Sequence, residues 1–156
     1  LINAAAADDS VGDRASARAR LTRALAIAEK QLPADDPQLA QALSTLGSLE
    51  VEEKDPRAAI PLFERALAIR EARPDAIAPR LLATTRRDLA AALRAADQDY
   101  PRQRDLSAAA LATLREVDPE GAKEVIAELE AWLGEAPGRS AKRAGKKKAK
   151  KKAKKT

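Results

Sequence analysis

The chain has 156 residues, of which 45% are hydrophobic but only 2% aromatic, and it contains no cysteine, histidine or methionine. This composition favours helices over a β-sandwich or barrel, and it excludes disulfides, Cys or His metal ligands and Cys–His or Ser–His–Asp catalytic groups. The net charge of +5 is unevenly divided, because residues 137–156 carry 11 of the 29 Lys and Arg residues and no Asp or Glu.

The charge division predicts two parts, an acidic helical domain over residues 1–136 and a basic tail over residues 137–156. We expect the tail to be disordered, because its charges repel each other and it has no core to bury. Residue 1 is Leu rather than Met, so we expect a piece of a longer protein whose domain is truncated at its N-terminus. The sequence shows neither about eighteen consecutive apolar residues nor a secretory signal, so we expect no membrane span and a cytoplasmic location.

The spacing of apolar residues predicts helices over 13–31, 37–53, 56–72, 79–97, 101–116 and 119–133. Asp-Pro pairs favour a helix start, since Asp caps free amides and Pro suits the first helical position. The pairs are Asp36-Pro37, Asp55-Pro56 and Asp118-Pro119, and Pro79 and Pro101 mark two starts with weaker caps. Because the connections are short, neighbouring helices should pack antiparallel.

The pentapeptide RALAI occurs at 23–27 and again 42 residues later, at 65–69. An apolar stripe recurs with it: Ala17, Leu21, Ala24, Leu25 and Ala28 correspond to Ala59, Phe63, Ala66, Leu67 and Arg70. A looser third copy aligns Pro56 with Pro101 at an offset of 45, which places three additional residues between Pro79 and Pro101. A fixed period is expected when helix pairs stack to bury a continuous core.

Two segments, PLFERALAIRE (61–71) and ARLTRALAIAEKQLPADDPQLAQALSTLG (19–47), resemble the tetratricopeptide repeat of the kinesin-light-chain type. That type has a 42-residue period and an acidic-Pro junction before the next helix. The resemblance covers 13–79 and is weaker over 80–116, where Thr85 and Asp88 replace apolar residues. It implies an all-α solenoid of antiparallel helix pairs, a right-handed superhelix with a concave peptide-binding face.

The final predicted helix contains the single Trp of the chain, Trp132, on one stripe with Val125, Leu129 and Leu133. We interpret this helix as a cap that covers the open end of the last repeat. A lone Trp that anchors a partner is the alternative.

A second resemblance concerns the same region. Ala-Arg-rich repeats that end in a helix such as EVIAELEAWLGEA (124–136) are similar to the C-terminal regions of large bacterial serine/threonine kinases. The sequence contains none of the kinase motifs. If the parent protein is a kinase, the resemblance implies that this piece is its interaction region.

Arg80, Arg87 and Arg94 form one stripe with Thr84 on the predicted helix 79–97. The resemblance implies that the first helix of each pair lines the concave face. The stripe would then form a cationic groove for an acidic peptide, since guanidinium groups suit carboxylates. The alternative is a solvated helix face that keeps the chain soluble.

Uncharged polar residues occupy the matching side of helix 37–53, namely Gln38, Gln41, Thr45 and Ser48. They suit hydrogen bonds to the backbone of an extended ligand, and they suit water equally well.

The tail lysines Lys146, Lys147, Lys148, Lys150, Lys151 and Lys152 favour weak, salt-dependent binding to nucleic acid or another anionic surface. No aromatic residue lies among them to stack on bases, which argues against specific recognition. A tail that only improves solubility is the alternative.

The sequence therefore favours a scaffold that binds a protein or peptide segment, with no catalytic site, cofactor or metal. The alternative function is the regulatory or interaction region of a larger bacterial serine/threonine kinase.

Overall fold

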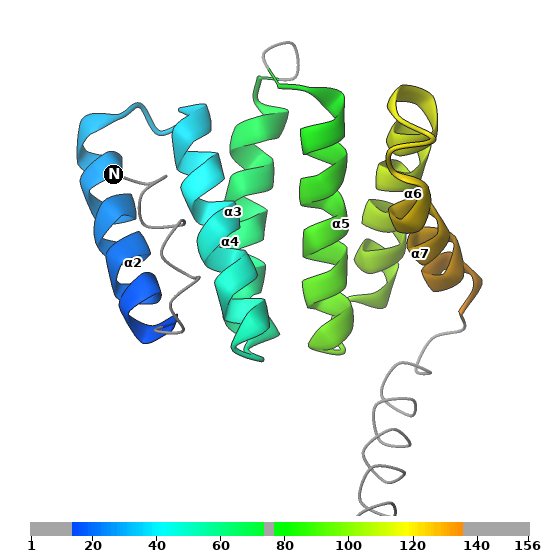
Figure 1. Ribbon diagram of the computed structural model, residues 1–156, viewed down its shortest axis with the longest axis horizontal. Coiled ribbons are helices and arrows are strands. Elements are labelled where there is room, and N and C mark those ends of the chain that lie inside the picture. Colours follow the sequence, from blue (N-terminus) through cyan, green and yellow to red (C-terminus); the bar gives the residue numbers. More distant parts are fainter. Residues whose placement is uncertain (1–13, 74–76, 136–156) are drawn as a thin grey trace, which may run out of the picture.

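The computed structural model describes residues 14–73 and 77–135, and six helices without any strand make up the regular structure of these ranges (Figure 1). The helices are α2 (Arg14–Gln31), α3 (Pro37–Glu52), α4 (Pro56–Glu71), α5 (Pro79–Ala95), α6 (Tyr100–Val117) and α7 (Lys123–Gly134). All bounds lie within two residues of the predicted ones except the start of the last helix.

The helices form two layers. The pairs α3–α4 and α5–α6 are antiparallel hairpins. At one end of the stack α2 packs against α3, at the other end α7 packs against α6, and α3 also contacts α5. Ion pairs join alternate helices: Glu29 to Arg65, Glu64 to Arg102, and Arg87 to Glu128. One layer is therefore α3, α5 and α7, the other is α2, α4 and α6, and the predicted stack of antiparallel helix pairs is confirmed.

Aspartates cap three of the helix starts. Asp36 accepts a hydrogen bond from the Gln38 amide at 2.8 Å, and Asp55 accepts one from the Ala58 amide at 3.1 Å. Asp99 caps α6 in the same way, whereas the residue before α5, Ala78, supplies no side-chain cap. The short side-chain caps thus fix where the chain turns from one helix into the next.

The prediction that Asp118-Pro119 starts the last helix is wrong, because α7 begins at Lys123. Asp118 instead accepts a hydrogen bond from the Gly121 amide at 3.1 Å, which closes a turn after α6. A Cβ atom at position 121 would lie 2.4 Å from Asp118 Oδ1, so a larger residue there would push the Asp118 carboxylate out of this hydrogen bond. The Asp-Pro pair caps a turn rather than the helix.

Residues of α5 correspond to residues of α3 at an offset of 43, and residues of α6 correspond to residues of α4 at an offset of 44. The sequence predicts offsets of 42 and 45. Burial shows the first shift: Ala40 and Ala83 are both 0% exposed, and buried Ala42 corresponds to buried Thr85. The second shift follows in the turn, where the cap Asp55 corresponds to Asp99. Pro101 is the second residue of α6, whereas Pro56 is the first residue of α4. Aligning the two prolines therefore gives 45 residues, one more than the true offset of 44.

The core consists of three consecutive groups of buried side chains. The first joins α2, α3 and α4, the second joins α4 and α5 with part of α6, and the third joins α5, α6 and α7. Phe63 is 2% exposed, and its ring fits against Gly47, where an added Cβ would lie 2.9 Å from the ring carbon Cε1. The last group is closed by Leu129 of α7, which is fully buried. Trp132 packs against the same group, in agreement with its interpretation as part of a cap.

The start of α6 holds the C-terminal end of α7. The Tyr100 hydroxyl donates to the Glu135 carbonyl at 2.8 Å, and Arg104 Nη1 donates to the Leu133 carbonyl at 2.7 Å. These donors satisfy carbonyl groups that a helix end leaves without partners. The capping helix is thereby fixed to the second hairpin.

Candidate functional site

α3 presents a row of uncharged polar side chains on the surface of the α3–α5–α7 layer. Gln38, Gln41 and Ser48 are exposed, and Thr45 is half-buried. The Thr45 hydroxyl donates to the Gln41 carbonyl at 3.0 Å, and the Ser48 hydroxyl donates to the Ser44 carbonyl at 3.1 Å. Because both hydroxyl protons are used within the helix, the oxygen lone pairs are what these residues offer to a ligand.

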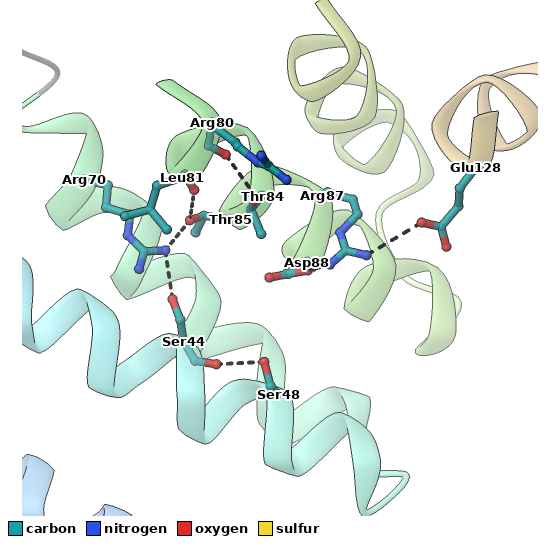
Figure 2. A network of polar contacts seen from close by, with 10 residues as sticks. All are labelled: Ser44, Ser48, Arg70, Arg80, Leu81, Thr84, Thr85, Arg87, Asp88 and Glu128. Carbon is teal, nitrogen blue, oxygen red and sulfur yellow. Dashed lines mark hydrogen bonds and ion pairs between the residues drawn. The ribbon is translucent and has the colours of Figure 1, made fainter. Parts of the chain in front are cut away.

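Arg70 reaches this row from the end of α4, as Figure 2 shows. The residue is 3% exposed, and its Nη1 donates to the Ser44 hydroxyl at 2.9 Å and to the Thr85 hydroxyl. Its Nη2 donates to Gln41 Oε1 at 3.3 Å. Through this single guanidinium group, α4 fixes side chains of both α3 and α5.

Asp88 on α5 lies beside two arginines. Arg87 Nη2 is 2.6 Å from Asp88 Oδ1, and Arg87 Nη1 is 3.7 Å from Glu128 Oε2 on α7 (Figure 2). Burial raises the pKa of Asp88, the charges of Arg87 and Arg70 oppose this rise, and the charge of Glu128 adds to it. Burial also lowers the pKa of Arg70, against the opposing charge of Asp88. The centre of the layer is a set of partly desolvated charges.

The other two arginines of the predicted stripe also face carboxylates of the chain. Arg80 forms an ion pair with Asp118, in the segment between α6 and α7. Arg94 forms an ion pair with Glu135, and its guanidinium carbon lies 5.5 Å from the centroid of the Trp132 ring. The stripe therefore links α5 to α7 and to the connection before it.

The structure places the predicted residues of α3 and α5 on adjacent helices of one layer. Thr84 is half-buried, and its hydroxyl donates to the Arg80 carbonyl at 2.9 Å. The prediction that the arginine stripe binds an acidic segment stays a prediction, and contacts within the chain already occupy all three guanidinium groups. The predicted tail lysines, from Lys146 to Lys152, lie outside the described residues.

Sequence reasoning missed four residues of this network: Ser44, Arg70, Thr85 and Asp88. The available signal was that Arg70 interrupts an otherwise apolar stripe, and that Thr85 and Asp88 stand where the 42-residue register expects apolar residues. A register of 43 residues aligns Asp88 with Thr45, a polar residue on the same face of α3. Polar residues at predicted core positions were thus the mark of this site.

Within residues 14–73 and 77–135, no group of three or more acidic side chains is placed to hold a metal ion. None of the helices described there is long and apolar enough to cross a membrane.

Residues 1–72 match a family model described as tetratricopeptide repeat. The fold is a tetratricopeptide-like helical repeat. Its second hairpin, α5–α6, continues the arrangement of α3–α4 beyond the matched residues. No curated protein matches the sequence. Tetratricopeptide repeats generally mediate protein–protein interaction, and their fold is typically non-catalytic. Whether this chain is of the kinesin-light-chain type stays a prediction.

Proposed function

We propose that the α3–α5–α7 face binds an extended segment of a partner protein, and that residues 1–136 form the binding domain. The observation that carries the proposal is the row of polar side chains on α3, in which Gln41 accepts a hydrogen bond from the buried Arg70, while Arg70 also donates to the neighbouring Ser44. A buried cation that fixes side chains of α3 against the buried Thr85 of α5 prepares their geometry before a ligand arrives, which lowers the entropic cost of binding.

Arg70 also sets the orientation of the Gln41 amide. A guanidinium group has no acceptor, so the atom of Gln41 that faces it is the oxygen, Oε1. The amide NH₂ group is then turned away from Arg70, where it suits a carbonyl of the ligand. Thr45 and Ser48 offer acceptor lone pairs for ligand N–H groups. The row therefore combines a donor with acceptors, as an extended backbone requires.

The spacing of the row fits an extended chain. Residues four positions apart on a helix are separated by about 6 Å along its axis, and alternate residues of an extended strand repeat every ~6.6 Å. Gln41 and Thr45 can therefore contact two residues of the ligand that lie two positions apart along an extended chain parallel to α3.

The acidity expected of the ligand is not part of this proposal. The arginines that would recognise an acidic segment are paired with Asp118, Asp88, Glu128 and Glu135. A second carboxylate from a ligand would have to displace one of these, which lie on the same chain and need no association entropy.

The test uses the full chain and a display library of random twelve-residue peptides. Peptides selected on the wild type are then measured against the double variant Gln41→Ala/Thr45→Ala. We expect affinity to fall about tenfold or more, because two hydrogen bonds contribute roughly 0.5–1.5 kcal/mol each.

The matched control is Thr22→Ala/Gln31→Ala, which removes the same two side chains from exposed positions of α2 in the other layer. It should leave the affinity of the selected peptides unchanged. Equal affinity of all three proteins for every selected peptide would refute the proposal. A place next to a serine/threonine kinase domain, and nucleic-acid binding by the tail, stay predictions.

A further inference from the structure

The α5–α7 half of the face carries more carboxylates than guanidinium groups. Glu124 and Glu128 are one helical turn apart on α7, and Glu128 faces Arg87 across the gap to α5. The carboxylates that ion pairs place along this side are Asp88, Asp118, Glu128 and Glu135, which face Arg80, Arg87 and Arg94, and Glu124 lies one turn before Glu128. Here the carboxylates outnumber the guanidinium groups that pair with them, although the chain as a whole is positive.

Asp88 lies close enough to Glu128 for the two carboxylates to affect each other. Its carboxyl is largely buried, and its pKa is raised by that burial and by the charge of Glu128, in spite of Arg87 and Arg70. Glu128 itself is 41% exposed and 3.7 Å from its nearest Arg87 nitrogen, beyond hydrogen-bond distance. An additional cation beside Glu124 and Glu128 would therefore find carboxylates that the chain's own arginines leave incompletely paired.

We propose that these carboxylates bind the lysine-rich segment of this same chain, residues 142–155. The segment is the complementary charge in the sequence, since residues 137–156 hold 11 Lys and Arg residues and no acidic residue. This inference goes beyond the proposed function and does not rest on it, because it concerns α7 and the tail rather than α3.

The tether is long enough. Glu124 lies ten residues before Gly134, the end of α7, a distance of about 15 Å along a helix. Lys142 follows Gly134 by eight residues, which can span up to about 26 Å when extended. The first lysine of the tail can thus return to the first turn of α7, and later lysines have more chain available.

Tethering also supplies the affinity. An exposed Lys–Glu pair contributes only about 0.2–1 kcal/mol and is screened by salt. A short flexible linker, however, gives an effective concentration on the order of millimolar, so several weak pairs suffice to hold the tail near the face. The tail would then occupy part of the layer that we propose for the partner segment, and would compete with it.

The chain is suited to a direct measurement, because it has one Trp, Trp132 on α7, and no Cys. A single Thr156→Cys substitution accepts an energy-transfer acceptor, and transfer from Trp132 then reports the position of the tail. We expect high transfer at low salt that falls as salt is raised. A tail that does not bind would behave oppositely, since screening its own repulsion makes a charged chain more compact.

Charge variants locate the binding face. Glu124→Gln/Glu128→Gln should lower the low-salt transfer by at least half, whereas Asp105→Asn/Glu116→Gln, which removes the same charge from exposed positions of α6, should leave it unchanged. Equal effects of the two variants, transfer that rises with salt, or transfer that grows with protein concentration would each overturn the proposal. The last result would mean that the tail binds another copy.

Discussion

Arg70 and Leu114 occupy equivalent positions in the two hairpins, 44 residues apart, and both are buried, at 3% and 2% exposure. Leucine at such a position needs no partner, whereas a buried guanidinium group costs several kcal/mol unless hydrogen bonds compensate it. Ser44, Gln41 and Thr85 supply acceptors for Arg70. Stacking of the repeat therefore does not require a cation at this position, and the effect of Arg70 is to organise side chains of α3.

Asp88 gives a pH-dependent prediction at the residue scale. Its raised pKa means that the folded state binds a proton more readily than the unfolded state. The ionised carboxyl therefore lowers stability at neutral pH, and this effect is relieved as pH falls through its folded pKa towards its unfolded one. We expect Asp88→Asn to be at least as stable as the wild type at pH 7, with the gain shrinking as pH falls towards 4.

Paired thermal melts of the two proteins across this pH range measure the difference. Asp35→Asn is the contrasting variant, because a hydrogen bond from Arg73 lowers the pKa of Asp35, so its contribution to stability should be lost at acid pH instead. An advantage of Asp88→Asn that increases on acidification would contradict the assignment.

At the scale of single elements, side-chain capping explains which helix starts can be predicted from the sequence. Asp36 and Asp55 cap α3 and α4 where expected, because an Asp before a Pro satisfies the free amides of a first turn. Asp118-Pro119 is the same dipeptide, but its carboxylate accepts a hydrogen bond from the Gly121 amide and closes a separate turn. Local patterns thus predict that a helix exists, whereas its start at Lys123 depends on the turn that Asp118 closes before it.

The uncapped start of α5 yields the next prediction. Ala78 has backbone angles of φ −56° and ψ 128°, close to the φ −68° and ψ 130° of the cap Asp36, and both precede a proline. Ala78→Asp should therefore cap α5 without strain and raise the free energy of unfolding by about 1 kcal/mol. Urea unfolding followed by circular dichroism measures this change.

Ala78→Ser separates capping from charge, since serine caps a helix without adding a carboxylate. Both variants should stabilise the chain, and Asp36→Ala should destabilise it by a similar amount. If only Ala78→Asp gains stability, attraction to the helix dipole or to Arg80 is responsible, and the capping argument fails.

At the scale of the whole molecule, periodicity in the sequence was sufficient to predict stacked antiparallel helix pairs, because burial of a shared apolar stripe determines that arrangement. It was not sufficient to predict the register of the second hairpin. A shift of one residue turns a helix by about 100°, which moves Asp88 from a predicted core position to the face shared with Thr45. The placement of the polar residues of α3 on one accessible face was predictable, whereas the network through Arg70 depends on contacts between three helices.

The open end of the stack leads to the last prediction. α7 buries Leu129 completely and covers Leu111 and Leu114 of α6 together with Ala83 of α5. A chain that ends at Val117 should therefore lose roughly 3–6 kcal/mol of stability, from one fully and several partly buried apolar side chains. It should also associate with itself, since an exposed repeat end is a ready apolar contact surface.

Sedimentation velocity at two protein concentrations, together with urea unfolding, tests both effects. The control is a chain that ends at residue 136, which retains α7 and should match the full chain in stability and remain independent of concentration. Leu129→Ala is the milder variant should the short chain fail to fold, with an expected loss of about 2–5 kcal/mol. Stability in a stacked repeat comes from each contact between neighbours, so both changes should lower it. Unchanged unfolding of the remaining helices after both the truncation at Val117 and Leu129→Ala would show that α7 is only appended to the repeat.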